Sequence, residues 1–183
     1  MKIIRTSLLF VLGLFATGCQ ADDDEHTEEH HYLQRQQDVA AVSHPLYKEE
    51  CGGCHLAYPP GLLPGSAWQQ IMAGLDHHFG DNAELDTSVR QELTDYLLQN
   101  SADRAGYRRS RRIMRSVDVD NPPLRITQLA YFTHEHDEIP SRMVKGNEQV
   151  LSLSNCNACH RRAEQGSFRE REINIPGYGQ WDD

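Results

Sequence analysis

Apolar residues recur at helical spacing in three stretches of the first half of the chain. The first stretch begins near Pro45, which suits the first turn of a helix, and it ends before Pro59-Pro60-Gly61. The second runs from about residue 66 to 79, and the third from about 88 to 99. Three helices are therefore expected in this half of the chain.

The second half has a weaker pattern. Residues 126–132 fit either a strand or a helix, and a helix is expected over about 148–164, with Gly166 as its stop. The tail beyond it contains Pro176 and two further glycines, which predict irregular structure. The patterns together predict a mostly α-helical protein, with a small helical lobe over 43–103 and a second, irregular lobe with one main helix over 104–183.

Residues 1–19 have the features of a secretory leader. Lys2 and Arg5 precede an apolar run over 8–15 that is too short to span a bilayer. The following Ala16-Thr17-Gly18-Cys19 is similar to a bacterial lipoprotein cleavage box, which predicts a lipidated N-terminus at Cys19. Ordinary cleavage near the same point is the alternative. We expect a periplasmic protein, anchored to a membrane by the lipid on Cys19.

Residues 20–42 are polar and acidic at their start, which predicts a disordered tether between the anchor and the folded part. The chain has 183 residues and a formal net charge of −9, which argues against nucleic acid as a partner. Hydrophobic residues make up 38% of the chain, which is low for a self-sufficient core. A buried prosthetic group would supply the missing apolar surface.

Two pentapeptides share the pattern Cys-x-x-Cys-His: Cys51-Gly52-Gly53-Cys54-His55 and Cys156-Asn157-Ala158-Cys159-His160. This pattern is the attachment signature of c-type haem. Two cysteines three residues apart on one helical turn point the same way and can bond both vinyl groups of a porphyrin. The histidine that follows can ligate the iron. We therefore expect two covalently bound haem c groups, with His55 and His160 as iron ligands.

Other uses of paired cysteines fit less well. A four-cysteine zinc site does not explain a histidine at the same offset in both copies. A thioredoxin-like motif needs a strand followed by a helix, which the flanking sequence does not predict. The chain has five cysteines, four of them in these motifs and the fifth at Cys19, so none remains for a disulfide.

Function depends on the sixth ligand of each iron, because an open face can bind small molecules whereas a filled face mostly moves electrons. No histidine or methionine follows His160, so the second haem must take such a ligand from upstream. The nearest candidates for the second haem are His134, His136 and Met143. Those for the first haem are His44, Met72, His77, His78 and Met114.

Helical phase separates His77 from His78. His78 lies seven residues after Ile71 of the apolar stripe, which is about 20° short of two full turns. His78 is therefore expected on the buried side, as an iron ligand, whereas His77 is expected to face water. The pattern alone does not choose between His134 and His136.

Further short motifs flank both haem sites in a fixed order. They are Tyr58-Pro59-Pro60-Gly61-Leu62-Leu63-Pro64, Trp68, His78-Phe79-Gly80-Asp81-Asn82-Ala83, Pro123-Leu124-Arg125-Ile126-Thr127, Phe132, Glu135-His136, Asn155, Ala163-Glu164 and Gly166. With the two pentapeptides, they resemble the bacterial dihaem cytochrome c family often called DHC. The resemblance covers about residues 45–176 and leaves out the leader and the tether.

The resemblance implies that two histidines bind each iron. It assigns His55, His160, His78 and His136 as the four ligands and leaves His134 as an extra histidine. Two arrangements fit this assignment. Each lobe can supply both histidines for its own iron, or each lobe can supply the sixth ligand of the other lobe's iron. The resemblance also implies a cytochrome c-like first lobe and electron shuttling, with an oxygen-binding mono-haem cytochrome c and a membrane cytochrome b as partners.

Two hypotheses about function follow. The first is an electron carrier with two bis-histidine haems and no enzymatic activity. The alternative is a haem enzyme or gas-binding protein, such as a peroxidase or small-ligand reductase, with one displaceable axial ligand. Six arginines between residues 104 and 115 form a basic run. They can steer a redox partner, pair with haem propionates or form a plain solvated face.

Overall fold

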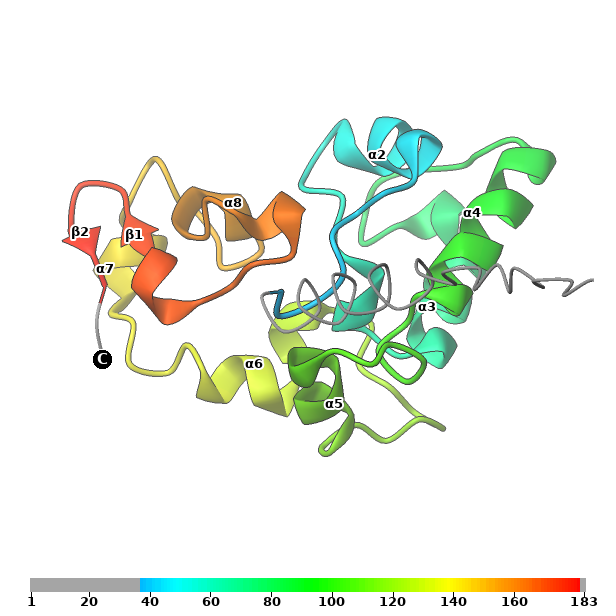
Figure 1. Ribbon diagram of the computed structural model, residues 1–183. Helices are drawn as coiled ribbons and strands as arrows, with labels where there is room; N and C mark the ends of the chain where they lie inside the picture. The colour runs from blue at the N-terminus through cyan, green and yellow to red at the C-terminus, as the bar shows by residue number, and fades with distance from the viewer. Residues whose placement is uncertain (1–36, 182–183) are drawn as a thin grey trace, which may run out of the picture.

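The computed structural model describes residues 37–181, which are mostly helical, as the sequence predicted (Figure 1). The predicted leader, Cys19 and most of the tether lie outside the described residues. The helices are α2 (Pro45–Gly52), α3 (Gly65–Ala73), α4 (Thr87–Gln99), α5 (Arg108–Met114), α6 (Ala130–His134), α7 (Ser141–Val144) and α8 (Cys156–Cys159). Short 3-10 turns are η1 (Pro60–Leu62), η2 (Leu75–His77), η3 (Ile126–Gln128), η4 (Ala163–Gln165) and η5 (Glu170–Glu172). Strands β1 (Asn174–Ile175) and β2 (Gly179–Gln180) form an antiparallel hairpin.

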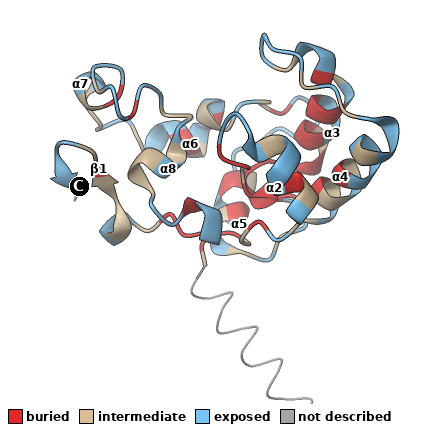
Figure 2. Cartoon of the chain, turned by 90° about the horizontal axis from the view of Figure 1, so that it is seen from above, coloured by how far each residue is buried: buried red, intermediate tan, exposed pale blue. Residues whose placement is uncertain are grey.

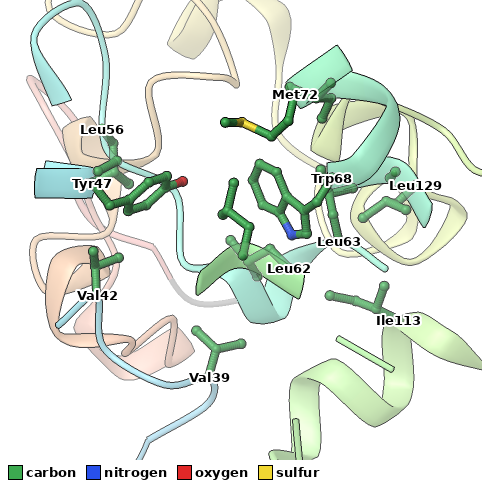
Figure 3. Packing of buried hydrophobic residues seen from close by; sticks show 14 of the residues in the cluster. Val39, Val42, Tyr47, Leu56, Leu62, Leu63, Trp68, Met72, Ile113 and Leu129 are labelled. Atoms are coloured by element: carbon green, nitrogen blue, oxygen red, sulfur yellow. The ribbon is translucent and has the colours of Figure 1, made fainter. Parts of the chain in front are cut away.

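Most of the hydrophobic core lies in the first half of the chain, where α3 packs against α4. Five residues of the second half join the same core: Ile113, Leu129, Phe132, Ala163 and Phe168. Trp68 of α3 and Leu97 of α4 are buried, and Trp68 Nε1 donates a hydrogen bond of 2.8 Å to the Pro60 carbonyl. Tyr47 of α2 points toward Trp68 from the other side of Leu62 (Figure 3). The three helices of this half therefore share one apolar centre.

All three helices expected in the first half are present, but two end early. α2 begins where expected, after a His44 side chain that accepts a hydrogen bond from a backbone N–H of its first turn. It ends at Gly52, inside the first Cys-x-x-Cys-His motif. α3 ends at Ala73 instead of residue 79, because Gly74, a poor helix former, has a φ of −119° and a ψ of 34°. α4 has its expected range to within one residue.

The prediction of one long helix over 148–164 is wrong, because only α8 and η4 are helical there. The side chains of Asn147 and Ser152 each accept a hydrogen bond from the backbone N–H two residues further on, which favours turns over helix. Leu151 has a φ of 64°, which a helix does not allow. The undecided stretch 126–132 is helical and forms η3 and the start of α6.

The two halves of the chain lie side by side, with α5 and α6 between them (Figure 1). Buried residues gather around α2, α3, α4 and α5, whereas the half with α7, α8 and the hairpin has few (Figure 2). α5, which the sequence analysis did not predict as a helix, contains most of the basic run. Within residues 37–181, no helix has the length and apolar character needed to cross a membrane.

Residues 38–42, expected at the end of the tether, pack into the fold. Val39 is fully buried, and Val42 is 3% exposed. The backbone N–H groups of Asp38 and Val39 donate to the Gly166 carbonyl at 3.0 and 3.1 Å. The Asp38 carboxylate accepts a hydrogen bond of 2.8 Å from the Phe168 N–H. The last residues of the expected tether therefore lie against the second half of the fold.

Replacement of Gly166 is expected to break this packing. Gly166 has a φ of 74°, and a Cβ added to it would clash with the Val39 carbonyl oxygen. Gly166→Ala should therefore lower the free energy of unfolding of the haem-loaded protein by about 2–4 kcal/mol in denaturant titrations followed by circular dichroism.

Gly177→Ala is the matched control. Gly177 has a φ of 78°, but no atom lies within 4 Å of an added Cβ. Gly177→Ala should therefore lower the free energy of unfolding by only about 1–2 kcal/mol, the cost of a non-glycine residue in the left-handed conformation. Equal losses in the two variants would contradict the packing of residues 38–42 against Gly166.

Candidate functional site

The first Cys-x-x-Cys-His motif lies at the end of α2. Cys51 belongs to the last turn of the helix, and Cys54 and His55 lie in the turn that follows. His55 Nδ1 lies 2.7 Å from the Leu56 carbonyl oxygen, within hydrogen-bond distance. An Nδ1–H that donates to a carbonyl leaves the lone pair on Nε2, which is a form of imidazole that binds metals.

The ring of His78 faces the ring of His55. Their centroids are 6.2 Å apart, and their planes differ by 22°. His78 follows η2, and the chain turns sharply after it because Phe79 has a φ of 56°. The side chain of His77 is 89% exposed. A turn, and not the helix face assumed from the sequence, therefore brings His78 to the first motif.

The second motif consists of α8 and His160. The backbone of His160 pairs with Ile173, next to β1, and its ring lies 5.3 Å from the ring of Phe168. The final segment of the chain therefore supports this motif. This explains how a helix of four residues holds its position.

The ring of His136 faces the ring of His160. Their centroids are 6.1 Å apart, and their planes differ by 71°. His136 Nδ1 lies 2.9 Å from the Phe132 carbonyl oxygen, and its ring stacks on the Phe132 ring at 3.9 Å. His134, at the end of α6, is exposed. The structure therefore places His136 beside the second motif. In both pairs, the second histidine comes from the same half of the chain as the motif histidine.

Each ring pair leaves room for one metal atom between its members. A metal–imidazole bond is about 2 Å long, so two such bonds span about 4 Å. The remainder of the 6.2 and 6.1 Å separations matches the distance from each ring centre to its own nitrogen. Two imidazoles with a pair of thiols alongside form a donor set that suits haem c.

A cavity of about 980 Å³ surrounds the second pair of histidines. Its wall includes both cysteines of the second motif and the apolar side chains of Leu129, Phe132, Val150 and Phe168. This volume lies at the upper end of the range for small-molecule sites. The half of the protein with few buried residues (Figure 2) therefore contains a space large enough for a bulky prosthetic group.

Burial keeps three of the four facing imidazoles neutral. For His160, burial and the positive charge of Arg109 lower the pKa to about 4. Burial also lowers the pKa of His136 and of His78 below its ordinary value. Neutral imidazole is the form that binds iron, so the site is prepared for a metal at neutral pH.

The cysteines do not resemble a redox-active pair. Burial raises the pKa of the Cys51 and Cys156 thiols to about 11, whereas thioredoxin-like motifs have lowered thiol pKa values. In the part of the chain that the structure describes, no three His, Cys, Asp or Glu side chains are grouped to hold a metal ion. This arrangement opposes the four-cysteine zinc site.

The other candidate ligands occupy different positions. Met72 is 4% exposed within the core, and His44 caps α2 with its Nε2 3.3 Å from Glu92. Met114 is half-buried at the end of α5, and Met143 lies on the cavity wall. The structure therefore gives the positions that face the motif histidines to His78 and His136.

Arg109 differs from the other arginines of the basic run, because it is mostly buried and lines the cavity. Its guanidinium donates hydrogen bonds of 2.9 Å to the Tyr131 hydroxyl and to the Phe168 carbonyl. It also lies 3.6 Å from Asp38. One feature of the sequence indicates that Arg109 is buried. It lies four residues before the buried Ile113, so both side chains are on the same face of α5.

Tyr58 is the second residue at the site that the sequence analysis did not single out as functional. Its ring lies 4.8 Å from the His55 ring, and the two planes differ by 21°. Its hydroxyl donates a hydrogen bond of 2.7 Å to the carbonyl of Ser154, two residues before Cys156. No sequence pattern predicts this contact, because it joins residues 96 positions apart.

Comparison with known proteins agrees with this geometry. The family model described as dihaem cytochrome c matches residues 47–168. The solved structure of a diheme cytochrome c from Shewanella baltica OS155 is 44% identical, covers 75% of this chain and 97% of its own, and superimposes with a TM-score of 0.64.

Two solved structures from Rhodobacter sphaeroides are also similar. A diheme cytochrome c is 42% identical over 71% of this chain and 100% of its own, with a TM-score of 0.63. A structure of DHC is 40% identical over 70% of this chain and 99% of its own, with a TM-score of 0.57. A comparison with curated proteins gives no match. The chain therefore belongs to the dihaem cytochrome c family, whose members carry two covalently attached haem c groups.

Proposed function

We propose that the protein is a periplasmic electron carrier in which two histidines bind each haem iron. His55 and His78 bind the first iron, and His160 and His136 bind the second. The thioether bonds are made by Cys51, Cys54, Cys156 and Cys159. The observation that carries the proposal is that each motif histidine has a second imidazole opposite it. The ring centroids are 6.2 Å apart in the first pair and 6.1 Å apart in the second.

Filled axial positions favour electron transfer over reaction with a substrate. Haem iron supplies a reversible one-electron change. The protein supplies neutral imidazoles held in place, since the Nδ1 atoms of His55 and His136 each face a backbone carbonyl. Such a contact orients Nε2 and raises its basicity. A second imidazole in place of methionine favours a lower reduction potential.

A haem enzyme or gas-binding protein is the alternative, and it requires one axial ligand to leave its iron. The solved relatives are named as cytochromes c, and these names indicate no enzymatic activity. Rapid carbon monoxide binding by the reduced wild-type protein, or a high-spin iron at rest, would favour the alternative and contradict the proposal.

Export and a lipid anchor complete the proposal. Cytochromes c are usually periplasmic or extracellular in bacteria. The charged start and apolar run of residues 1–19 support a cleaved leader, and the motif that ends at Cys19 supports lipidation. The acidic residues that follow then link the anchor to two haem lobes, 43–103 and 104–183.

Redox partners are expected to approach the second haem beside α5. The exposed Arg108, Arg111 and Arg112 border the cavity, whereas Arg109 is mostly buried. In a chain of net charge −9, such a positive patch favours the approach of an acidic partner surface. The family resemblance suggests an oxygen-binding mono-haem cytochrome c and a membrane cytochrome b as partners.

The ligand assignment is tested by removing one imidazole at a time. His78→Ala and His136→Ala should each convert one of the two haems from low-spin to high-spin in optical and electron paramagnetic resonance spectra. The altered haem should then bind carbon monoxide when reduced, because its sixth position is open.

Neighbouring histidines provide matched controls. His77→Ala and His134→Ala remove exposed imidazoles one or two positions from the proposed ligands. Both variants should keep two low-spin haems. A spin change in either control, or none in His78→Ala and His136→Ala, would overturn the assignment.

The lipid anchor is tested at Cys19. Cys19→Ser should move the haem-loaded protein from the membrane fraction to the soluble periplasmic fraction, because the thiol that receives the lipid is absent. Intact-mass spectrometry of the wild type should show a diacylglycerol on the mature protein. A mature mass without it would rule out the anchor.

Steering by α5 is tested with ferricyanide, an anionic oxidant. Replacing Arg108 and Arg111 together by glutamine should slow oxidation of the reduced protein about tenfold at low salt, with little effect at high salt. Replacing the exposed cations Lys48 and Arg90 by glutamine removes the same charge away from the cavity and is the control. Equal slowing in both double variants would exclude a local steering patch.

A further inference from the structure

Tyr58 contacts the first haem-binding motif and the segment that leads into the second. On one side its ring lies 4.8 Å from His55 with planes 21° apart, which is a stacked arrangement. On the other side its hydroxyl donates a 2.7 Å hydrogen bond to the Ser154 carbonyl. One side chain therefore touches an iron ligand of the first site and the segment that leads into the cysteines of the second.

The surroundings of Tyr58 fix its position. Its own carbonyl accepts a hydrogen bond of 2.8 Å from the Tyr47 hydroxyl, so a buried residue of α2 holds its backbone. Cys51 and Cys156, one from each motif, pack against the same hydrophobic core as Tyr58. The two motifs are therefore parts of one packed unit, and Tyr58 lies where they meet.

The phenol of Tyr58 stays protonated. Burial raises its pKa to about 12. A protonated phenol donates its hydrogen bond to Ser154 at neutral pH. The contact is therefore constant, and it does not depend on the ionisation of the tyrosine.

We propose that Tyr58 is the positioning residue that couples the two haem sites, because it ties the His55 imidazole to the segment before Cys156. It thereby sets the rate at which an electron passes between the irons. In that step the iron that gives the electron is oxidised and the other is reduced, while Tyr58 keeps its proton and its oxidation state. The inference rests on the proposed electron-carrier function.

The test uses Tyr58→Phe in the full haem-loaded protein. This substitution keeps the ring against His55 and removes only the hydroxyl that reaches Ser154. Exchange spectroscopy by NMR on the half-reduced protein measures the rate of intramolecular electron exchange from the haem methyl signals. Loss of one hydrogen bond of ordinary strength should slow this exchange about two- to tenfold and speed amide hydrogen exchange at residues 151–156 by a similar factor.

Tyr96→Phe is the matched control. Tyr96 packs on Tyr47, with ring centroids 5.4 Å apart, and its hydroxyl accepts a hydrogen bond from the backbone of Ser43 in the same half of the chain. Its removal should leave both rates as in the wild type. Equal electron-exchange rates in Tyr58→Phe, Tyr96→Phe and the wild type would overturn the inference.

A second variant covers the case in which Tyr58→Phe does not load haem. Tyr47→Phe removes the hydrogen bond to the Tyr58 carbonyl and should slow electron exchange by a smaller factor. An unchanged rate in that variant would also contradict the coupling role. Failure of the electron-carrier proposal is seen separately, as a high-spin or carbon monoxide-binding iron in the wild type.

Discussion

Two pairs of imidazoles, each with its ring centroids about 6 Å apart, are the constraint on which the rest of the structure depends. In each pair one ring comes from a Cys-x-x-Cys-His motif and the other from a turn that the motif does not contain. The fold must hold these turns in place without filling the space between the rings. Two local features do this. Phe79, whose φ of 56° lies in the left-handed region, turns the chain after His78, and the ring of Phe132 stacks on His136.

The two halves meet this constraint in different ways. The first half has most of the side-chain core, around Trp68, so its histidines lie on a scaffold of packed side chains. The second half has short helices around a cavity of about 980 Å³, and its buried side chains are few (Figure 2). Covalently attached haem provides apolar surface that this half otherwise lacks. The buried Arg109, held by Tyr131 and Phe168, adds a polar anchor at the cavity wall.

Contacts distant in sequence make one unit of the two haem sites. Asp38 and Val39 bind the backbone at Gly166, and Tyr58 reaches Ser154. The rate of electron exchange between two redox centres depends on the distance between them. In this protein the segment of residues 38–42 and the half-buried Tyr58 provide contacts of the kind that hold it. Packing between the halves therefore belongs to function as much as to stability.

The sequence by itself determined the local chemistry: two haem-attachment motifs, a mostly helical fold, and the range of α4. Each of these depends on residues close together in the chain, so periodicity and spacing suffice to predict them. Residue spacing left His134 and His136 open and the family resemblance assigned His136, whose ring the structure places opposite the second motif. Only the tertiary structure decided that a turn positions His78, instead of the helix that ends at Ala73. It also replaced the helix expected over 148–164 by turns around Leu151, and it packed residues 38–42 against Gly166. The packing of residues 38–42 on Gly166 and the approach of His136 to His160 join residues far apart in the chain, so no short stretch of sequence predicts them. The early end of α3 at Gly74 and the turns at Asn147 and Ser152 have local causes, which helical periodicity alone does not detect.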